Sequence, residues 1–504
     1  MIGGIILYDL VNRIPYAELF LSDAGAFSRT DLLALTNRPW SFSVYMMLGE
    51  TSQVVALMLI NAATALLLMA GLWTRWASLL CWILLISLQH RNPLVLNGGD
   101  TLLSLLVFWA MFLPLNGRWS LDALLSKDGV GTFPVTNRYV GIPGMALMLQ
   151  VVFLYAFTVM LKTGGLWKSG EAVGYVVMNM SLIKAGAVWL SQFEGLLPFI
   201  SKLTWHWEWF GCLLLLCPFA NGLTRMAAIF GYSLMQLSFY LTLDLALFPF
   251  VSTAACLALL PGQFWRLSER LWRDGPWKRG VEVLRREAVS MRGCGGKIIR
   301  PGRGAAVLTG TALALVLFWN LRGLPDSPLK QHTPDWVKQV MYAAKLRQSW
   351  GMFAANPPRT SKWYALEAQL ANGDSIDLLN PSEPFTLRRP QLFTDRLPDR
   401  RWTKFLSALS KKKYRSLRDD FLEYFVSRWN RRVDGPRKIE RVRMLYVRER
   451  IRPGAGYGKA EIETLATLWV EGIRQVVNVE IPDESGEALE ETDDEGIEQE
   501  GADL

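Results

Sequence analysis

The sequence predicts a polytopic α-helical membrane protein with about 8–9 spans, followed by a C-terminal extramembrane α+β domain and a disordered acidic tail. Three observations predict this fold class. Long apolar runs recur through the first two thirds of the chain. Hydrophobic residues make up 51% of the 504 residues, with 21 Trp and 24 Phe, yet 20% of the residues are charged. The last stretch is rich in acids and nearly free of aromatics. A soluble chain rarely combines so many long apolar runs with such polar segments.

Charge and cysteine content narrow the function classes. The net charge of +9 comes mostly from basic blocks outside the apolar runs. A basic stripe can bind nucleic acid, but in a multi-span protein it marks the cytoplasmic side, so we expect no nucleic-acid partner. The chain has 5 Cys without a CxxC spacing and only 3 His. This content argues against a disulfide framework and a metal site.

The N-terminal third should hold one abbreviated helix and three spans. The first apolar run, Met1 to Leu10, is too short to cross a bilayer, and it lacks the basic start and cleavage site of a signal peptide. Asp9 and Arg13 near its end carry opposite charges four residues apart, on one helix face. A polar loop follows over residues 22–39. The next spans are expected at Gln53–Trp73, Trp76–Leu88 and Leu102–Leu115.

An unusual polar cluster separates the second and third of these apolar runs. Its members are Gln89, His90, Arg91, Asn92, Asn97 and Asp100. Within it, Asn97-Gly98-Gly99-Asp100 forms a compact turn, because Gly-Gly bends freely and an Asn/Asp pair can cap the next helix. Ionisable groups near membrane depth usually face a cavity or each other. The alternative is a water-exposed hairpin loop between two spans.

The membrane domain should extend to residue 262 and be followed by one more span. Further apolar segments lie at Tyr139–Leu161, which ends in Lys162, and at Phe210–Ala220, Leu223–Thr242 and Leu245–Leu260. A weaker segment, Ala172–Leu190, is interrupted by Lys184 and is expected at the membrane interface. The loop 263–303 carries eleven Lys and Arg against four acids, which predicts a cytoplasmic location. The last span, Gly304–Leu321 within residues 304–323, would then place the following domain outside the cytoplasm of a cell-membrane protein.

The C-terminal part has the composition of a soluble domain, over residues 324–482. Trp363–Leu379 reads as a β-hairpin turning at Asn372-Gly373. Tyr414–Trp429 reads as an amphipathic helix with Leu417, Phe421 and Phe425 on its apolar stripe. Further strands are expected at Met444–Val447, Thr464–Val470 and Gln475–Ile481. The tail, residues 483–504, should be disordered because it is acidic and poor in apolar residues.

Several stretches of the chain resemble a known family. RNPLVLNGGDTLL and FWAMFLPLNGRWSLDALL, within Ser87 to Leu125, are similar to the core of the HTTM family, bacterial membrane proteins related to vitamin K-dependent gamma-carboxylase. Four more stretches fit: Asp9-Leu10 with Arg13, Gly71 to Arg75, Tyr155 to Gly170, and Trp350 to Pro358. Together they cover most of Met1 to Leu379.

The resemblance implies an enzyme activity. It would be a quinone-dependent carboxylation of glutamate in an exported peptide or protein, or a quinone epoxidation, with reduced vitamin K or another menaquinone-type hydroquinone as cofactor and no metal. Tyr155 to Gly170 is similar to the segment that carries the lysine base, which places Lys162 in that role. The neutral amine would take a proton from the hydroquinone, and burial favours the neutral form of a lysine. A lysine that ends a span and snorkels to the interface is the alternative.

Other polar or aromatic residues are candidates for lining the cofactor cavity. They are Arg91, Asn92, Asn97, Asp100, Trp167 and Glu208. The chain departs from the animal carboxylase at Gly99, where the latter has a histidine that assists the lysine. A second function therefore stays open, that of a non-catalytic membrane factor for maturation or export of a secreted peptide. The Trp350 to Pro358 stretch suits an interface anchor, and we assign it no catalytic role.

Overall fold

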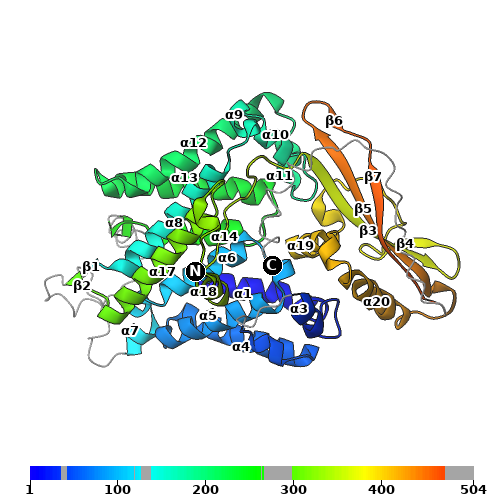
Figure 1. Cartoon of the computed structure of the whole chain (residues 1–504), viewed down its shortest axis with the longest axis horizontal. Coiled ribbons are helices and arrows are strands. Elements are labelled where there is room, and N and C mark those ends of the chain that lie inside the picture. Colours follow the sequence, from blue (N-terminus) through cyan, green and yellow to red (C-terminus); the bar gives the residue numbers. More distant parts are fainter. Residues whose placement is uncertain (36–41, 118–119, 126–137, 263, 266–297, 471–504) are drawn as a thin grey trace, which may run out of the picture.

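The computed structural model describes residues 1–35, 42–117, 120–125, 138–262, 264–265 and 298–470. Figure 1 shows a helical body on one side, a C-terminal β-sheet on the other, and a short helix, α19, between them. The predicted basic loop falls mostly outside the described residues. The predicted strand Gln475–Ile481 and the acidic tail lie wholly outside them.

The N-terminal part of the body is a group of packed helices. They are α1 (Ile2–Arg13), α2 (Ala17–Leu21), α3 (Arg29–Leu35), α4 (Thr51–Ala70), α5 (Thr74–Arg91), α6 (Gly98–Ala110) and α7 (Leu121–Leu125). Helix α4 ends where Gly71 adopts φ 70°, a left-handed cap that glycine takes at little cost. Helix α5 runs three residues beyond the expected end at Leu88, because the polar residues that follow find partners inside the protein.

The second part of the body is built from α8 to α17. The helices are α8 (Ile142–Leu161), α9 (Gly165–Ser169), α10 (Ala172–Val176), α11 (Ala185–Leu190), α12 (Leu197–Leu216), α13 (Asn221–Thr242), α14 (Phe248–Leu257) and α17 (Arg303–Arg322). The aromatic and polar stretch before Phe210 is itself part of helix α12. The helix therefore begins at Leu197, 13 residues before the start that the sequence predicted. The two-residue strands β1 (Arg138–Tyr139) and β2 (Ile298–Ile299) pair in parallel.

Among the described residues, three helices are long and apolar enough to cross a membrane, namely α4, α8 and α17. Helices α6 and α14 are apolar but shorter. Large apolar side chains point outward from the body, for example Leu59 on α4, Phe199 on α12 and Phe230 on α13. Exposed apolar surface of this extent is costly in water and is compatible with lipid contact.

The C-terminal domain is an antiparallel sheet packed against helices. Its strands are β3 (Thr360–Leu370), β4 (Ser375–Asp377), β5 (Ile439–Arg452), β6 (Gly456–Tyr457) and β7 (Glu461–Trp469). The order is β4-β3-β5-β6, with β7 also paired to β5. The expected hairpin is confirmed as β3 and β4, and the expected amphipathic helix as α20 (Leu417–Asn430). Helix α18 (Asp335–Ala343) lies in the connection from α17.

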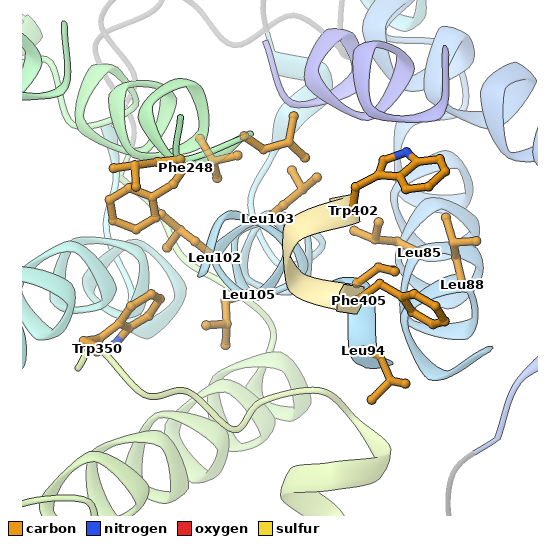
Figure 2. Close-up of a cluster of buried hydrophobic side chains, with 14 of the residues drawn as sticks. Leu85, Leu88, Leu94, Leu102, Leu103, Leu105, Phe248, Trp350, Trp402 and Phe405 are labelled. Carbon is orange, nitrogen blue, oxygen red and sulfur yellow. The ribbon is translucent and has the colours of Figure 1, made fainter. Parts of the chain in front are cut away.

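Helix α19 (Arg400–Leu409) joins the two parts through one apolar core. Figure 2 shows Trp402 and Phe405 of α19 in the same cluster as Leu85 and Leu88 of α5. The Phe20 ring lies 5.4 Å from that of Trp402 and 5.2 Å from that of Phe405, between ring centroids. Aromatic contacts of this kind therefore fix the sheet domain against the helical body.

Candidate functional site

Lys162 lies in a buried ion pair at the end of α8. Its Nζ donates to Glu208 Oε1 at 2.7 Å and Oε2 at 2.8 Å. Only 4% of Lys162 and 3% of Glu208 are exposed. Nζ also lies 4.2 Å from the ring centroid of Trp167. The structure thus brings together three of the predicted site residues from α8, α9 and α12, and the lysine does not snorkel to the surface.

The segment from Trp350 to Pro358 holds the loop that carries Lys162. Trp167 Nε1 donates to the Phe353 carbonyl at 2.9 Å, and the Leu166 amide donates to Asn356 Oδ1 at 3.0 Å. The Gly164 amide donates to the Ala355 carbonyl at 3.1 Å. A side chain at Gly164 would collide with the Asn356 amide, so it would displace the hydrogen bond that Asn356 accepts from Leu166. The stretches Tyr155 to Gly170 and Trp350 to Pro358, which are far apart in the sequence, therefore meet here.

An aromatic and thiol cluster lies beside the ion pair. The rings of Tyr155 and Tyr232 stack with centroids 3.7 Å apart. Tyr232 donates its hydroxyl to the backbone carbonyl of Glu208 at 3.1 Å, and Gln236 donates to the Tyr155 hydroxyl at 3.1 Å. Cys212 contributes a thiol 3.3 Å from the Tyr232 hydroxyl. These side chains are buried and keep water away from the ion pair, which strengthens its electrostatic attraction.

The polar cluster between α5 and α6 is buried rather than exposed as a hairpin loop. Arg91 and Asn92 are both 0% exposed. Arg91 Nη2 donates to the Phe27 carbonyl at 2.9 Å, and Asn92 Nδ2 donates to the Phe20 carbonyl at 2.9 Å. These two residues anchor α2 and the segment after it, and they line neither of the cavities described below.

Asp100 belongs to a buried group of four charges. Asn97 and Asp100 form a capping box at the start of α6, as the turn predicted. Asp100 Oδ1 also accepts from Arg13 Nη2 at 2.6 Å and from Arg401 Nη2 at 3.1 Å. Asp9 pairs with Arg13 at 2.8 Å and with Arg401 at 2.5 Å. Two acids and two arginines thus balance, and we name these four residues the charge quartet.

Sequence reasoning missed Arg401 as a member of this group. It lies 301 residues from Asp100 along the chain. The sequence around Arg401 does not set it apart, because several other arginines and lysines occur nearby. Only the packing of α19 on the body brings its guanidinium to the first turn of α6.

Gly99 leaves no room for a larger side chain such as histidine. A Cβ at this position would lie 2.6 Å from the Phe248 amide nitrogen and 2.9 Å from the Leu247 carbonyl carbon. Helix α14 packs directly on this turn of α6. A side chain here would require the backbone of α14 to move, so the absence of histidine follows from close packing.

Two cavities lie near these residues. The smaller, of about 90 Å³, is lined by Asn97, Thr158, Phe248, Trp350 and Phe353 among others. Neither cavity is lined by Lys162, Trp167, Glu208 or Asp100, so Asn97 alone of the candidates reaches a described cavity. Within the described ranges, no group of three or more His, Cys, Asp and Glu could hold a metal ion. The roles assigned to these residues stay predictions.

Comparison with family models, curated proteins and solved structures found no match to this chain. The functional interpretation therefore depends on the residues and on the geometry given above.

Proposed function

We propose that this chain is a cell-membrane protein with about 8–9 spans that carries out quinone-dependent carboxylation of glutamate, or quinone epoxidation, on an exported peptide or protein. The single observation that carries the proposal is the burial of Lys162 against Glu208 and Trp167, inside the helical body. The stretch around it resembles the lysine-bearing segment of the carboxylase family. The C-terminal domain would lie outside the cytoplasm.

The buried pair gives Lys162 a route to a neutral amine. In a low-dielectric site the charged and neutral forms of a Lys–Glu pair differ by the position of one proton. With that proton on the Glu208 carboxyl, the amine has a free lone pair and can accept a proton from a nearby acid. Glu208 keeps its own proton in this step, so the charge of the ammonium so formed would be balanced by the anion of the acid that gave up the proton, while a Glu208 oxygen 2.7 Å away still accepts from the ammonium.

The lining of the smaller cavity supports the proposed quinone. Its walls include Phe248, Trp350 and Phe353, which suit an apolar ring. Asn97 Nδ2 is buried and meets no hydrogen-bond partner among the described residues, so it can donate to a quinone oxygen. When bound, a reduced quinone would supply the acidic proton and the reducing equivalents. Trp167 connects Lys162 to this cavity through its hydrogen bond to Phe353.

The test is incorporation of labelled carbon dioxide into a glutamate-rich peptide by the purified protein in detergent, with reduced quinone. Lys162→Ala should lower activity by about 100-fold or more, the usual effect of removing a catalytic base. Lys162→Arg should also be inactive, because guanidinium stays protonated. Lys168→Ala and Lys184→Ala serve as matched controls and should keep activity. Full activity in Lys162→Arg would disprove the base assignment.

A second candidate function is a non-catalytic factor for maturation or export of a secreted peptide. It is favoured by the pairing of Lys162 with Glu208 and by the absence of Lys162 from both described cavities. If neither carbon dioxide incorporation nor epoxide formation occurs across several quinones and peptides, this second function replaces the first.

The proposed orientation has its own test. Reporter fusions at residues 280 and 480 should report opposite sides of the membrane, because α17 lies between them and is long enough to cross it. Cytoplasmic signals from both fusions would mean that α17 does not span.

A further inference from the structure

The larger cavity lies between the helical body and the C-terminal domain and has a volume of about 1100 Å³. Its walls come from the ends of α8 and α17, from the connection after α17, and from α19. Both α8 and α17 are candidate membrane spans, and the C-terminal residues of each reach the cavity: Phe157 and Leu161 from α8, and Trp319 and Arg322 from α17. The cavity therefore lies at the level where these helices would leave the bilayer.

The lining is strongly basic. Eight Lys and Arg side chains contribute to it, against the single acid Asp326. They are Arg322, Lys330, Lys345, Arg347, Lys362, Arg400, Lys404 and Lys411. Like charges gathered around one enclosed space create a positive potential that concentrates anions. The charge pattern thus points to an anionic ligand.

Two buried polar groups in the same wall point independently to a ligand. Gln348 is 5% exposed, and its Oε1 accepts from Gln150 Nε2 and Trp350 Nε1, both at 2.7 Å. Its Nε2 and the Thr403 hydroxyl meet no partner among the described residues. A buried donor without an acceptor is costly, and both residues line the cavity. An anion with several acceptor oxygens would satisfy them once small side-chain shifts uncover the two atoms toward the cavity.

The remaining wall is apolar. Phe157, Leu161 and Trp319 lie where the two spans end, and Leu94 and Leu324 add to this side. A ligand that fills the whole cavity therefore needs an anionic head and an apolar chain. We propose that this cavity binds an anionic phospholipid of the membrane, one whose phosphate charge is not offset by a cationic group, with the phosphate among the basic side chains and the acyl chain against the ends of α8 and α17. Arginine and lysine are the side chains that bind phosphate best.

The proposal does not depend on chemistry at Lys162, so its test measures binding. The probes are dihexanoyl phosphatidylglycerol and dihexanoyl phosphatidylcholine, titrated as monomers into the full chain in an uncharged detergent, with inorganic phosphate as a third arm. The anionic lipid should bind at least about tenfold more tightly than either other probe, and added salt should weaken it. Equal binding of both lipids would overturn the charge argument. If inorganic phosphate bound as tightly as the anionic lipid, the acyl chain would contribute nothing to binding. The cavity would then be a site for free phosphate and not for an amphiphile.

Matched variants locate the site. The triple variant Lys330→Gln, Arg347→Gln and Lys404→Gln should lose about tenfold or more in affinity for the anionic lipid, because each side chain lines the cavity. The triple variant Arg432→Gln, Arg437→Gln and Lys459→Gln removes the same charge from exposed positions outside the cavity and should bind as the wild type does. An equal loss in both triples would mean diffuse attraction to a basic surface and would overturn the proposal.

A single conservative substitution tests the same site with less risk of misfolding. Thr403→Val keeps the shape of the side chain and removes one unpartnered hydroxyl, so it should weaken lipid binding by about threefold or more while the apparent melting temperature stays unchanged. Unchanged affinity in this variant would remove Thr403 from the site. Deleting residues 483–504 should leave the dissociation constant as it is. If the deletion increased the affinity for the anionic lipid tenfold, the acidic tail would be the ligand that occupies the cavity in the full chain.

Discussion

Lys162 and Glu208 depend on each other because both charges are buried. The side chains are each 3% exposed, and the two carboxylate oxygens both accept from the same ammonium group. Replacing one partner leaves the other charge without compensation in an apolar surrounding, which is far more costly than losing both. The pair is thus a feature of stability, whatever its chemistry.

We expect Glu208→Gln to destabilise the protein by about 3–5 kcal/mol, the usual cost of an uncompensated buried charge. The measurement is the apparent melting temperature in detergent, followed by tryptophan fluorescence. Glu194→Gln makes the same change at an exposed position of the body and should have little effect. The double variant Lys162→Met and Glu208→Leu should recover most of the loss. No recovery in the double variant would show that the two residues act independently.

At this scale the sequence identified the polar residues but not their partners. Lys162, Glu208 and Asp100 stood out because ionisable groups are rare within apolar runs. Their pairing follows from helix packing, since Lys162 and Glu208 lie 46 residues apart on different helices. No local pattern carries that information.

At the scale of elements, the close packing of α6 on α14 leaves different amounts of space at two neighbouring glycines of α6, Gly98 and Gly99. A Cβ at Gly98 would lie 3.6 Å from the Phe248 ring, an ordinary contact, whereas one at Gly99 would lie 2.6 Å from the Phe248 amide nitrogen. Gly99→Ala should therefore destabilise the protein by about 1–3 kcal/mol, as overpacking does. Gly98→Ala is the control and should be tolerated. Thermal unfolding of both variants decides the point, and equal melting temperatures would mean that α14 shifts without cost.

Helix α20 carries a pH-dependent element. Burial, followed by the nearby carboxylates Asp31, Glu423 and Asp419, raises the pKa of Asp420 to about 6. The unfolded value is about 3.9. The folded state therefore binds more protons between about pH 4 and 6, and its stability falls as the pH rises through that window.

Asp420→Asn should remove this dependence. At pH 7 the variant should be more stable than wild type, by well under about 1 kcal/mol because Asp420 is partly exposed to solvent. At pH 4 the two should unfold at the same temperature. Glu383→Gln removes a charge from an exposed turn and is the control. A variant no more stable than wild type at pH 7 would show that solvent screens the repulsion fully.

Element prediction succeeded where periodicity was clear. The hairpin of β3 and β4 follows from alternation and an Asn-Gly turn, and the uniformly apolar runs gave α4, α8 and α17. The start of α12 was misplaced because Trp, His and Glu residues resemble an interface segment, although Pro198 suits the first turn of a helix. The end of α5 was misplaced because Gln89 to Arg91 are polar yet buried.

The whole molecule is organised by contacts between segments far apart in the chain. Composition separates an apolar part from a polar part, and the structure has a helical body with three membrane-length apolar helices and a separate sheet domain. Composition does not show that α19 inserts into the body, nor that a basic cavity forms where the two parts meet. These features arise from packing between residues about 300 positions apart, for which a single sequence has no local signal.

The charge quartet holds the C-terminal domain to the body. Arg401 is the one member of the quartet that belongs to that domain, and it forms ion pairs with Asp9 of α1 and Asp100 of α6. With Arg401 removed, Arg13 alone faces two buried acids, so one negative charge has no compensation. Arg401→Met should therefore cost about 3–5 kcal/mol.

Hydrogen exchange measured by mass spectrometry should show faster exchange in α19 and in the strands of the C-terminal domain of Arg401→Met. Arg415→Met removes an arginine from an exposed position of the same domain and should leave exchange unchanged. Adding Asp9→Asn to Arg401→Met leaves Arg13 and Asp100 as a neutral pair 2.6 Å apart, so protection should return by more than half. If the double variant exchanged as fast as Arg401→Met, the domain would be held by the aromatic contacts of α19 and not by charge balance.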